Sequence, residues 1–155
     1  MTELSDLLMP EAVVSGMSVT TKKALFQQLG AASARAYDLD PSQVSSRLAE
    51  REKLGSTGFG GGIAIPHGKI EGLDQVRGMF VRLSKPVDFG AVDELPVDLV
   101  FVLLSPVDAG AAHLKALACV SRRLRDRGFA AKLRGAGSED ALFALLTGVE
   151  ARDAA

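Results

Sequence analysis

One apolar segment constrains the fold of this 155-residue chain more than any other feature. Residues 97–104 read Val-Asp-Leu-Val-Phe-Val-Leu-Leu, so Asp98 is their only charged residue. Such a run is typical of a strand that is buried on both faces, as in a sheet with helices on each side. We therefore expect the rest of the chain to supply helices for both faces.

Helical and extended patterns interleave along the chain as this expectation requires. Asp40, Ser138 and either Ser18 or Thr20 are candidate caps at helix starts. The patterns predict helices at 18–37, 41–55, about 109–126 and 138–148, and strands at 78–83 and 97–104. These elements indicate the α/β class, with a sheet between layers of helices.

Composition and charge exclude several classes of partner. Eighteen basic and nineteen acidic residues give a net charge of −1, which predicts no nucleic-acid binding. No basic leader and no long apolar run is present, so we expect a cytoplasmic protein without membrane insertion. The single cysteine, Cys119, excludes an intramolecular disulfide.

No linker or repeat divides residues 1–155, so we expect one domain, with a frayed tail from about residue 150. The basic cluster of the chain is interpreted as the solvated face and end of the helix at 109–126. It consists of Arg122, Arg123, Arg125 and Arg127.

The glycine-rich stretch 55–69 carries the main candidate for chemistry, His67. This histidine follows the short segment Ile63–Ile65, which Pro66 ends, and the glycines before it let a partner's backbone or a phosphate come close. An imidazole with an ordinary pKa near 6.5 is mostly neutral and nucleophilic at neutral pH. From the loop alone, a structural turn and a phosphate site are equally compatible, because glycine turns are common.

Two further residues make a phosphate site more plausible. His113 lies on the inward stripe of its predicted helix, which it shares with Leu117, Val120 and Leu124. A lone histidine on such a stripe is usually a core residue. Its place in the first turn of the helix instead favours a nearby anion.

Arg51 shares a helical stripe with Val44 and Leu48, so it is expected on the buried side. A buried arginine needs an anion, either an acidic side chain or a phosphate in the adjacent loop. One anion there could be reached by Arg51, His67 and His113 together.

Other chemistries have less support. Two histidines without paired carboxylates make a poor metal site, so we expect no metal. Cys119 lies about 120° from His113 on the helical wheel and is interpreted as a packed residue. Ser56 and Thr57 lack the Gly-x-Ser-x-Gly context of a nucleophile. Their hydroxyls are interpreted as hydrogen-bond donors to a phosphate, or the two residues simply as part of a turn.

At this point the chain resembles the enzyme IIA domains of the mannitol/fructose/nitrogen class of the bacterial phosphotransferase system. The motifs that carry the resemblance stand in the family's order and, with the terminal helices, cover nearly the whole chain. They are Arg51-Glu52, Gly55-Ser56-Thr57-Gly58, residues 62–69 (Gly-Ile-Ala-Ile-Pro-His-Gly-Lys), residues 96–101 (Pro-Val-Asp-Leu-Val-Phe) and His113-Leu114. The loop and the Pro-His-Gly-Lys ending resemble the free-standing, nitrogen-regulatory branch most. Phe59 departs from the pattern, which has a smaller aliphatic residue there.

The resemblance implies a mixed, mostly parallel sheet flanked by helices and assigns roles to the candidate residues. His67 would carry the phosphoryl group as a tele-phosphohistidine, with His113 beside it and Arg51 in contact with the phosphate. The loop of Gly55, Ser56, Thr57 and Gly58 would help to bind the phosphate.

The implied function is a phosphoryl relay that needs no cofactor or metal. The chain itself would be a phosphoprotein that acts in signal transduction. A histidine phosphocarrier protein would be the donor, and downstream regulatory proteins the targets, with a nitrogen, potassium or carbon signal as output. The chain would be a component of a phosphotransferase rather than an enzyme that turns over alone. The alternatives are a sugar-specific enzyme IIA that serves a separate IIB unit, a binding module whose His67 is not phosphorylated, and, with little support, a hydrolase using Ser56 or Cys119.

Overall fold

The apolar segment near the middle of the sequence forms the central strand of the sheet in the computed structural model, which describes residues 2–148. This strand is β6 (Val97–Ser105), and it pairs antiparallel with the long strand β5 (Arg77–Val87). On its other edge it pairs in parallel with two short strands, β3 (Ile63–Ala64) and β4 (His67–Lys69).

The outer strands complete a mixed sheet. β1 (Val13–Met17) runs parallel to β5, and β2 (Gly58–Gly60) runs antiparallel to β3. The resulting order is β1-β5-β6-β3-β2, with β4 also on β6. Within residues 2–148 parallel pairings outnumber antiparallel ones, although the longest pairing, β5 with β6, is antiparallel.

Successive side chains of β6 enter two different cores, as expected for a strand covered on both faces. One core contains Leu99, Phe101 and Leu103, and the other contains Val100, Val102 and Leu104. All six are fully buried. The predicted α/β sandwich with a mixed sheet is therefore confirmed.

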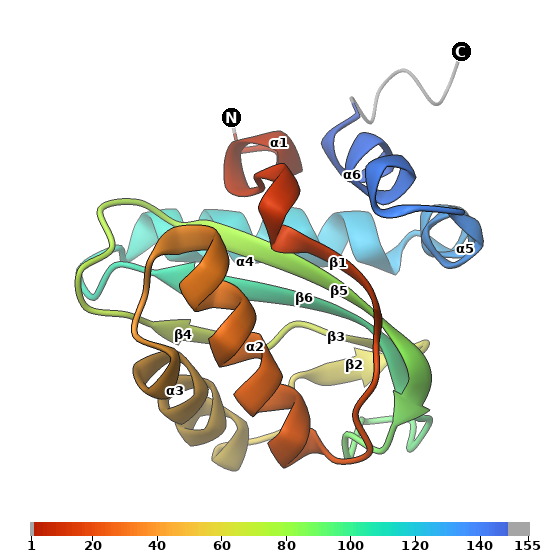
Figure 1. Ribbon diagram of the computed structural model, residues 1–155, viewed down its shortest axis with the longest axis horizontal. Helices are drawn as coiled ribbons and strands as arrows, with labels where there is room; N and C mark the ends of the chain where they lie inside the picture. The colour runs from red at the N-terminus through yellow and green to blue at the C-terminus, as the bar shows by residue number, and fades with distance from the viewer. Residues whose placement is uncertain (1, 149–155) are drawn as a thin grey trace.

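Helices cover the two faces unequally (Figure 1). α2 (Lys22–Tyr37) and α3 (Pro41–Lys53) lie in front of the sheet in this view, and α4 (Ala111–Arg125) lies behind it. α5 (Arg127–Gly135), α6 (Glu139–Thr147) and the short α1 (Leu4–Leu7) pack into the same core as α4. The helices predicted from sequence correspond to α2, α3, α4 and α6.

Side-chain caps set several of the helix starts. Asp40 caps α3 and Ser138 caps α6, as predicted. α2 is capped by Thr21, whose side chain accepts from the Ala24 backbone N–H. The expectation of Ser18 or Thr20 as its cap was wrong, because the chain is still extended at Thr21 and turns helical only at Lys22.

The basic cluster at the end of α4 is only partly a solvated face, which corrects the prediction. Arg123 is buried, and its guanidinium lies over the ring of Phe129 from α5, 4.3 Å from the ring centroid. α5 was not predicted, and it packs against the end of α4 to make this contact possible. The predicted tail from residue 150 lies outside the described residues.

Among the described residues, none of the helices combines the length and the apolar character that crossing a membrane would require.

Candidate functional site

His67 begins a new strand rather than ending the preceding one. β3 pairs with Leu99 and Val100 of β6, Pro66 interrupts the ladder, and β4 resumes it with His67 opposite Leu103. The Leu103 backbone N–H donates to the Pro66 carbonyl at 3.0 Å, so the interruption leaves the local backbone paired. Backbone hydrogen bonds to β6, both at Pro66 and along β4, therefore hold His67 in the sheet.

The hydrogen bonds of His67 define the protonation of its ring. Nδ1 lies 2.9 Å from the Ile65 carbonyl oxygen, and this oxygen can only accept, so Nδ1 carries a hydrogen. The Arg51 Nε–H donates to Nε2 at 3.2 Å, so Nε2 presents its lone pair. The ring is thus neutral, with Nε2 as its nucleophilic nitrogen.

Arg51 lies in the last turn of α3, half-buried as the helical spacing predicted. Besides His67, its guanidinium contacts the next turn of the chain, since Nη1 donates to the Gly55 carbonyl at 2.9 Å. The guanidinium of Arg51 therefore links the glycine loop to the imidazole of His67 through hydrogen bonds.

His113 reaches the same place from the other face of the sheet. It lies in the first turn of α4, and the centroids of its ring and of the His67 ring are 5.4 Å apart. Its Nδ1 is 2.6 Å from the hydroxyl of Ser105, a fully buried residue at the end of β6. A hydroxyl can donate or accept; when it donates to Nδ1, the ring hydrogen of neutral His113 lies on Nε2.

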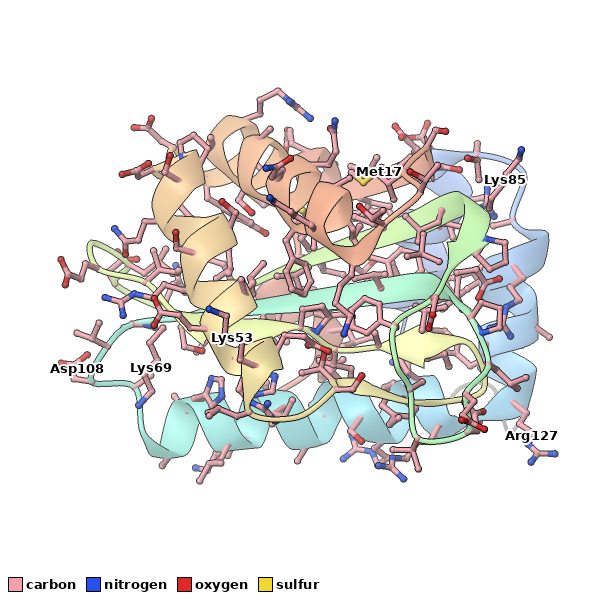
Figure 2. The ribbon with its side chains drawn as sticks, turned by 90° about the horizontal axis from the view of Figure 1, so that it is seen from below. Met17, Lys53, Lys69, Lys85, Asp108 and Arg127 are labelled. Atoms are coloured by element: carbon pink, nitrogen blue, oxygen red, sulfur yellow. The ribbon has the colours of Figure 1, made fainter. Side chains whose placement is uncertain are left out.

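The three residues line a common cavity of about 600 Å³. Its wall also holds basic, acidic and apolar side chains, namely Arg47, Lys69, Glu50, Leu54 and Val107. Figure 2 shows Lys53, at the end of α3, and Lys69 on the side of the molecule where α4 begins. On the cavity wall the basic residues Arg47, Arg51 and Lys69 thus outnumber the acidic Glu50, beside the two imidazoles.

Burial keeps both imidazoles neutral. Removal from water lowers the pKa of His67, and the neighbouring Arg51 lowers it further, against the hydrogen bond to Ile65 and the charge of Glu52. Removal from water also lowers the pKa of His113, as do the charges of His67 and Lys69. Neutral rings suit nucleophilic attack and hydrogen-bond donation.

The hydroxyls of the glycine loop contact the protein itself. Ser56 Oγ donates to the Phe89 carbonyl, and Thr57 Oγ1 donates to the Glu52 carboxylate at 2.7 Å. Of the residues that the structure describes, the cavity wall includes none of Gly55, Ser56, Thr57 and Gly58. A direct phosphate contact by this loop stays a prediction, and the two hydroxyls serve the turn in this structure.

Two buried polar residues next to the site were not singled out as site residues from the sequence. Ser105 is the partner of His113, and the side chain of Glu52 is only 6% exposed while it accepts three hydrogen bonds. Glu52 follows Arg51 in the motif, which was the only available signal; of its partners, Thr57 is five residues away and Lys22 is thirty residues away. Cys119 is buried in the core, as interpreted. Within residues 2–148 no group of three His, Cys, Asp or Glu side chains is placed to hold a metal ion.

Comparison with known proteins agrees with this geometry. Residues 6–149 match the family model described as phosphoenolpyruvate-dependent sugar phosphotransferase system, EIIA 2. A nitrogen regulatory protein of Bradyrhizobium diazoefficiens is 46% identical over 143 residues, covering 92% of this chain and 94% of the relative. One from Escherichia coli is 41% identical over 150 residues, covering 96% and 91%. The crystal structure of the nitrogen regulatory protein IIA-Ntr from Neisseria meningitidis superposes with a TM-score of 0.86 at 38% identity, covering 93% of this chain and 99% of that one.

Proposed function

The chain belongs to the EIIA 2 family of the phosphoenolpyruvate-dependent sugar phosphotransferase system, and from this premise we propose that His67 accepts and passes on a phosphoryl group. The observation that supports this role best is the protonation of His67. Its Nδ1–H is held by the Ile65 carbonyl, so Nε2 has a lone pair directed at the guanidinium of Arg51. A nucleophile and an anion-binding group thus face the same point.

The proposed step needs no further reagent. Nε2 of His67 attacks the phosphorus of a donor phosphohistidine whose other ring nitrogen is protonated; the P–N bond of the donor breaks as the P–Nε2 bond forms, and the donor leaves as a neutral imidazole. The hydrogen on Nδ1 of His67 stays there, bonded to the Ile65 carbonyl, so the product is a protonated tele-phosphohistidine with the phosphoryl group on Nε2. Positioning and charge neutralisation supply the catalysis in such transfers.

The cationic wall suits the phosphorylated state. A phosphoryl group on nitrogen brings a charge comparable to other phosphorylated side chains, about −1.5 to −2 near neutral pH. Arg51 then donates to a phosphoryl oxygen instead of to Nε2, and the Nε2–H of His113 supplies a second donor. Charge-assisted bonds of this kind are roughly twice as strong as neutral ones.

The rim of the cavity supports a protein as the donor. Leu54 is 84% exposed and Val107 is 53% exposed, and both line the cavity; Leu114, next to His113, is 66% exposed. Large exposed apolar side chains around a polar centre are typical of a protein interaction site. A histidine phosphocarrier protein in the cytoplasm is therefore the proposed donor.

We propose a regulatory output. This rests on the similarity to nitrogen regulatory proteins over nearly the full length of the chain. The proposed targets are downstream regulatory proteins that distinguish the two states of His67. A sugar-specific role through a separate IIB unit is the alternative, and transfer to purified IIB proteins would reveal it.

Incubation with phosphoenolpyruvate, enzyme I and a phosphocarrier tests the relay. We expect one acid-labile, base-stable phosphate per chain, lost in His67→Ala. His113→Ala should still be labelled on His67, about 10²-fold to 10³-fold more slowly, as for loss of one preorganised donor. If the wild-type chain gains no phosphate, or His67→Ala is fully labelled, the proposal is wrong.

A further inference from the structure

The carboxylate of Glu52 lies beside the site but outside its cavity wall. It is almost completely buried and accepts from three donors: Lys22 Nζ at 2.9 Å, the Thr57 backbone N–H at 3.0 Å and Thr57 Oγ1 at 2.7 Å. A buried carboxylate is costly unless it is paired and hydrogen-bonded in this way. Two of its three bonds go to one residue, Thr57.

Thr57 connects this carboxylate to the histidine through the backbone. The Thr57 carbonyl accepts from the Ile65 N–H at 3.1 Å, and the Ile65 carbonyl accepts from Nδ1 of His67 at 2.9 Å. The path from Glu52 to the imidazole therefore consists of hydrogen bonds and the two residues Thr57 and Ile65. Moving Thr57 moves the carbonyl that holds the ring.

The same turn also positions the guanidinium. Arg51 precedes Glu52 on α3, and its Nη1 donates to the Gly55 carbonyl, two residues before Thr57. A turn fixed at both Gly55 and Thr57 keeps Arg51 Nε directed at His67 Nε2.

We infer that Glu52 is the positioning residue of this site: by clamping Thr57 it holds the Ile65 carbonyl against Nδ1 of His67 and so keeps the ring hydrogen on Nδ1 and the lone pair on Nε2. Lys22 of α2 completes the clamp from the neighbouring helix. The inference rests on the proposed relay for its consequence, while the state of the His67 ring can be measured without any phosphoryl donor.

The first experiment measures the tautomer of His67 by ¹⁵N NMR of the imidazole in the unphosphorylated protein at a pH where the ring is neutral. In the wild type, Nδ1 should resonate as a protonated nitrogen and Nε2 as an unprotonated one. In Glu52→Gln the two signals should move toward each other, because the ring is released from a fixed acceptor. Unchanged signals in this variant would overturn the inference.

A second variant separates position from charge. Thr57→Val keeps the Glu52 charge but loses the hydroxyl bond, so it should shift the His67 signals in the same direction. Thr57→Ser, which keeps the hydroxyl, should restore them. If only Glu52→Gln moves the signals, Glu52 acts through its charge and the clamp is refuted.

The second readout is the rate of phosphoryl acceptance. Loss of an outer-shell partner of a metal-binding histidine typically costs about 10-fold to 100-fold, and we expect a loss of this size for Glu52→Gln and Thr57→Val. Asp98→Asn is the matched control, since it removes a carboxylate from another ion pair, Asp98 with Arg134, away from the cavity.

Asp98→Asn should leave both the His67 signals and the rate unchanged. For Glu52→Gln, shifted His67 signals together with a normal rate of phosphoryl acceptance would refute the positioning role. If the wild type accepts no phosphate while the NMR shifts appear as expected, the relay fails and the clamp on the ring stands.

Discussion

At the scale of single residues, the guanidinium of Arg51 holds two acceptors in the unphosphorylated protein, the Gly55 carbonyl and His67 Nε2. Neither is an anion, so its positive charge remains available to an incoming phosphoryl group. The two explanations offered by the sequence, an ion pair and a phosphate contact, are therefore distinguished: the contacts within the described residues favour the second.

Arg51→Gln should reduce phosphorylation more than stability. We expect a melting temperature close to that of the wild type, and a lower equilibrium phosphorylation at a fixed donor ratio. Arg51→Lys should recover only part of the phosphorylation, because it keeps the charge but loses the planar fork. If Arg51→Gln melts far below the wild type yet phosphorylates normally once folded, Arg51 is a structural residue.

The two lowered histidine pKa values also predict how stability depends on pH. Because the pKa of His67 and of His113 lies below the unfolded value of about 6.5, the folded state binds fewer protons than the unfolded state in the interval between them. Their contribution to stability is fully present above about pH 6.5 and is lost as the pH falls through the lowered values.

Urea unfolding at pH 7 and pH 5 measures this effect. The wild type should lose stability between the two values, and the double variant His67→Asn/His113→Asn should lose less. The carboxylates are the same in both proteins, so their contribution cancels in the comparison. Equal losses would show that the histidines titrate alike in the folded and unfolded chains.

At the scale of elements, α2 and α3 approach each other closely at one glycine. A Cβ on Gly30 would lie 2.4 Å from the Pro41 carbonyl oxygen at the start of α3, so any side chain there must push the helices apart. α3 carries Arg51 and Glu52 at its other end. The packing of this helix pair therefore sets where both residues stand.

Gly30→Ala should destabilise the protein by about 1–3 kcal/mol, the usual cost of overpacking, although alanine is the better helix former. The midpoint of urea unfolding measures it. Gly135→Ala is the matched control, because a Cβ on Gly135 in α5 meets no atom within 4 Å. Equal midpoints for the two variants would refute the close approach.

The elements also show what the sequence could and could not predict. β6, α3 and α6 were predictable because a nearly continuous apolar run and two side-chain caps are local signals. α1, β1 and β2 lacked such signals: α1 and β2 span four and three residues, and β1 contains a glycine. Their existence depends on neighbours that come later in the chain, as β1 depends on β5. α5 has such a signal, its cap Asp126, which the sequence prediction did not use.

The same distinction applies within the site. His67, His113 and Arg51 could be proposed from motif and helical spacing, and the structure brings them together around one cavity. The clamp that Glu52 forms on Thr57 could not be predicted, because it is completed by Lys22, thirty positions earlier in the chain. The Lys22 Nζ lies 2.9 Å from the Glu52 carboxylate. Thr57 Oγ1 points toward that carboxylate, which lies five residues earlier and is itself paired with the distant Lys22.

At the scale of the whole molecule, Arg82 of β5 ties the sheet to the C-terminal helices. Its Nη1 donates to the carbonyls of Leu133 and Ala136 at the end of α5, and its Nη2 donates to Ser15 Oγ of β1. The Ala136 carbonyl lies just beyond the helix, and the Leu133 carbonyl also accepts from the Ala136 backbone N–H at 3.4 Å. Arg82 pairs with Leu99 of β6, whereas His67 pairs with Leu103. These two positions on β6 are four residues, or on the order of 13 Å, apart.

Arg82→Met should therefore lower the free energy of unfolding by about 1–3 kcal/mol, because it removes the guanidinium hydrogen bonds to partly buried carbonyls, and should spare phosphoryl acceptance by the folded protein. Urea unfolding and the phosphorylation assay, run on the same preparation, check both parts. Arg127→Met, exposed at the start of α5 (Figure 2), should change stability by no more than about 0.5 kcal/mol. Slower phosphorylation in folded Arg82→Met would show that the two regions are coupled.

The sheet separates two cores, and the site takes Arg51 from the helix layer on one side and His113 from the layer on the other. A partly folded chain in which only one layer has docked would hold one of these groups beside His67 and lack the second. We expect such a chain to accept a phosphoryl group more slowly, so the full rate of the proposed relay is reached only when both layers have docked. If the proposed regulatory output holds, incompletely folded copies would contribute little to the phosphorylated pool that target proteins recognise.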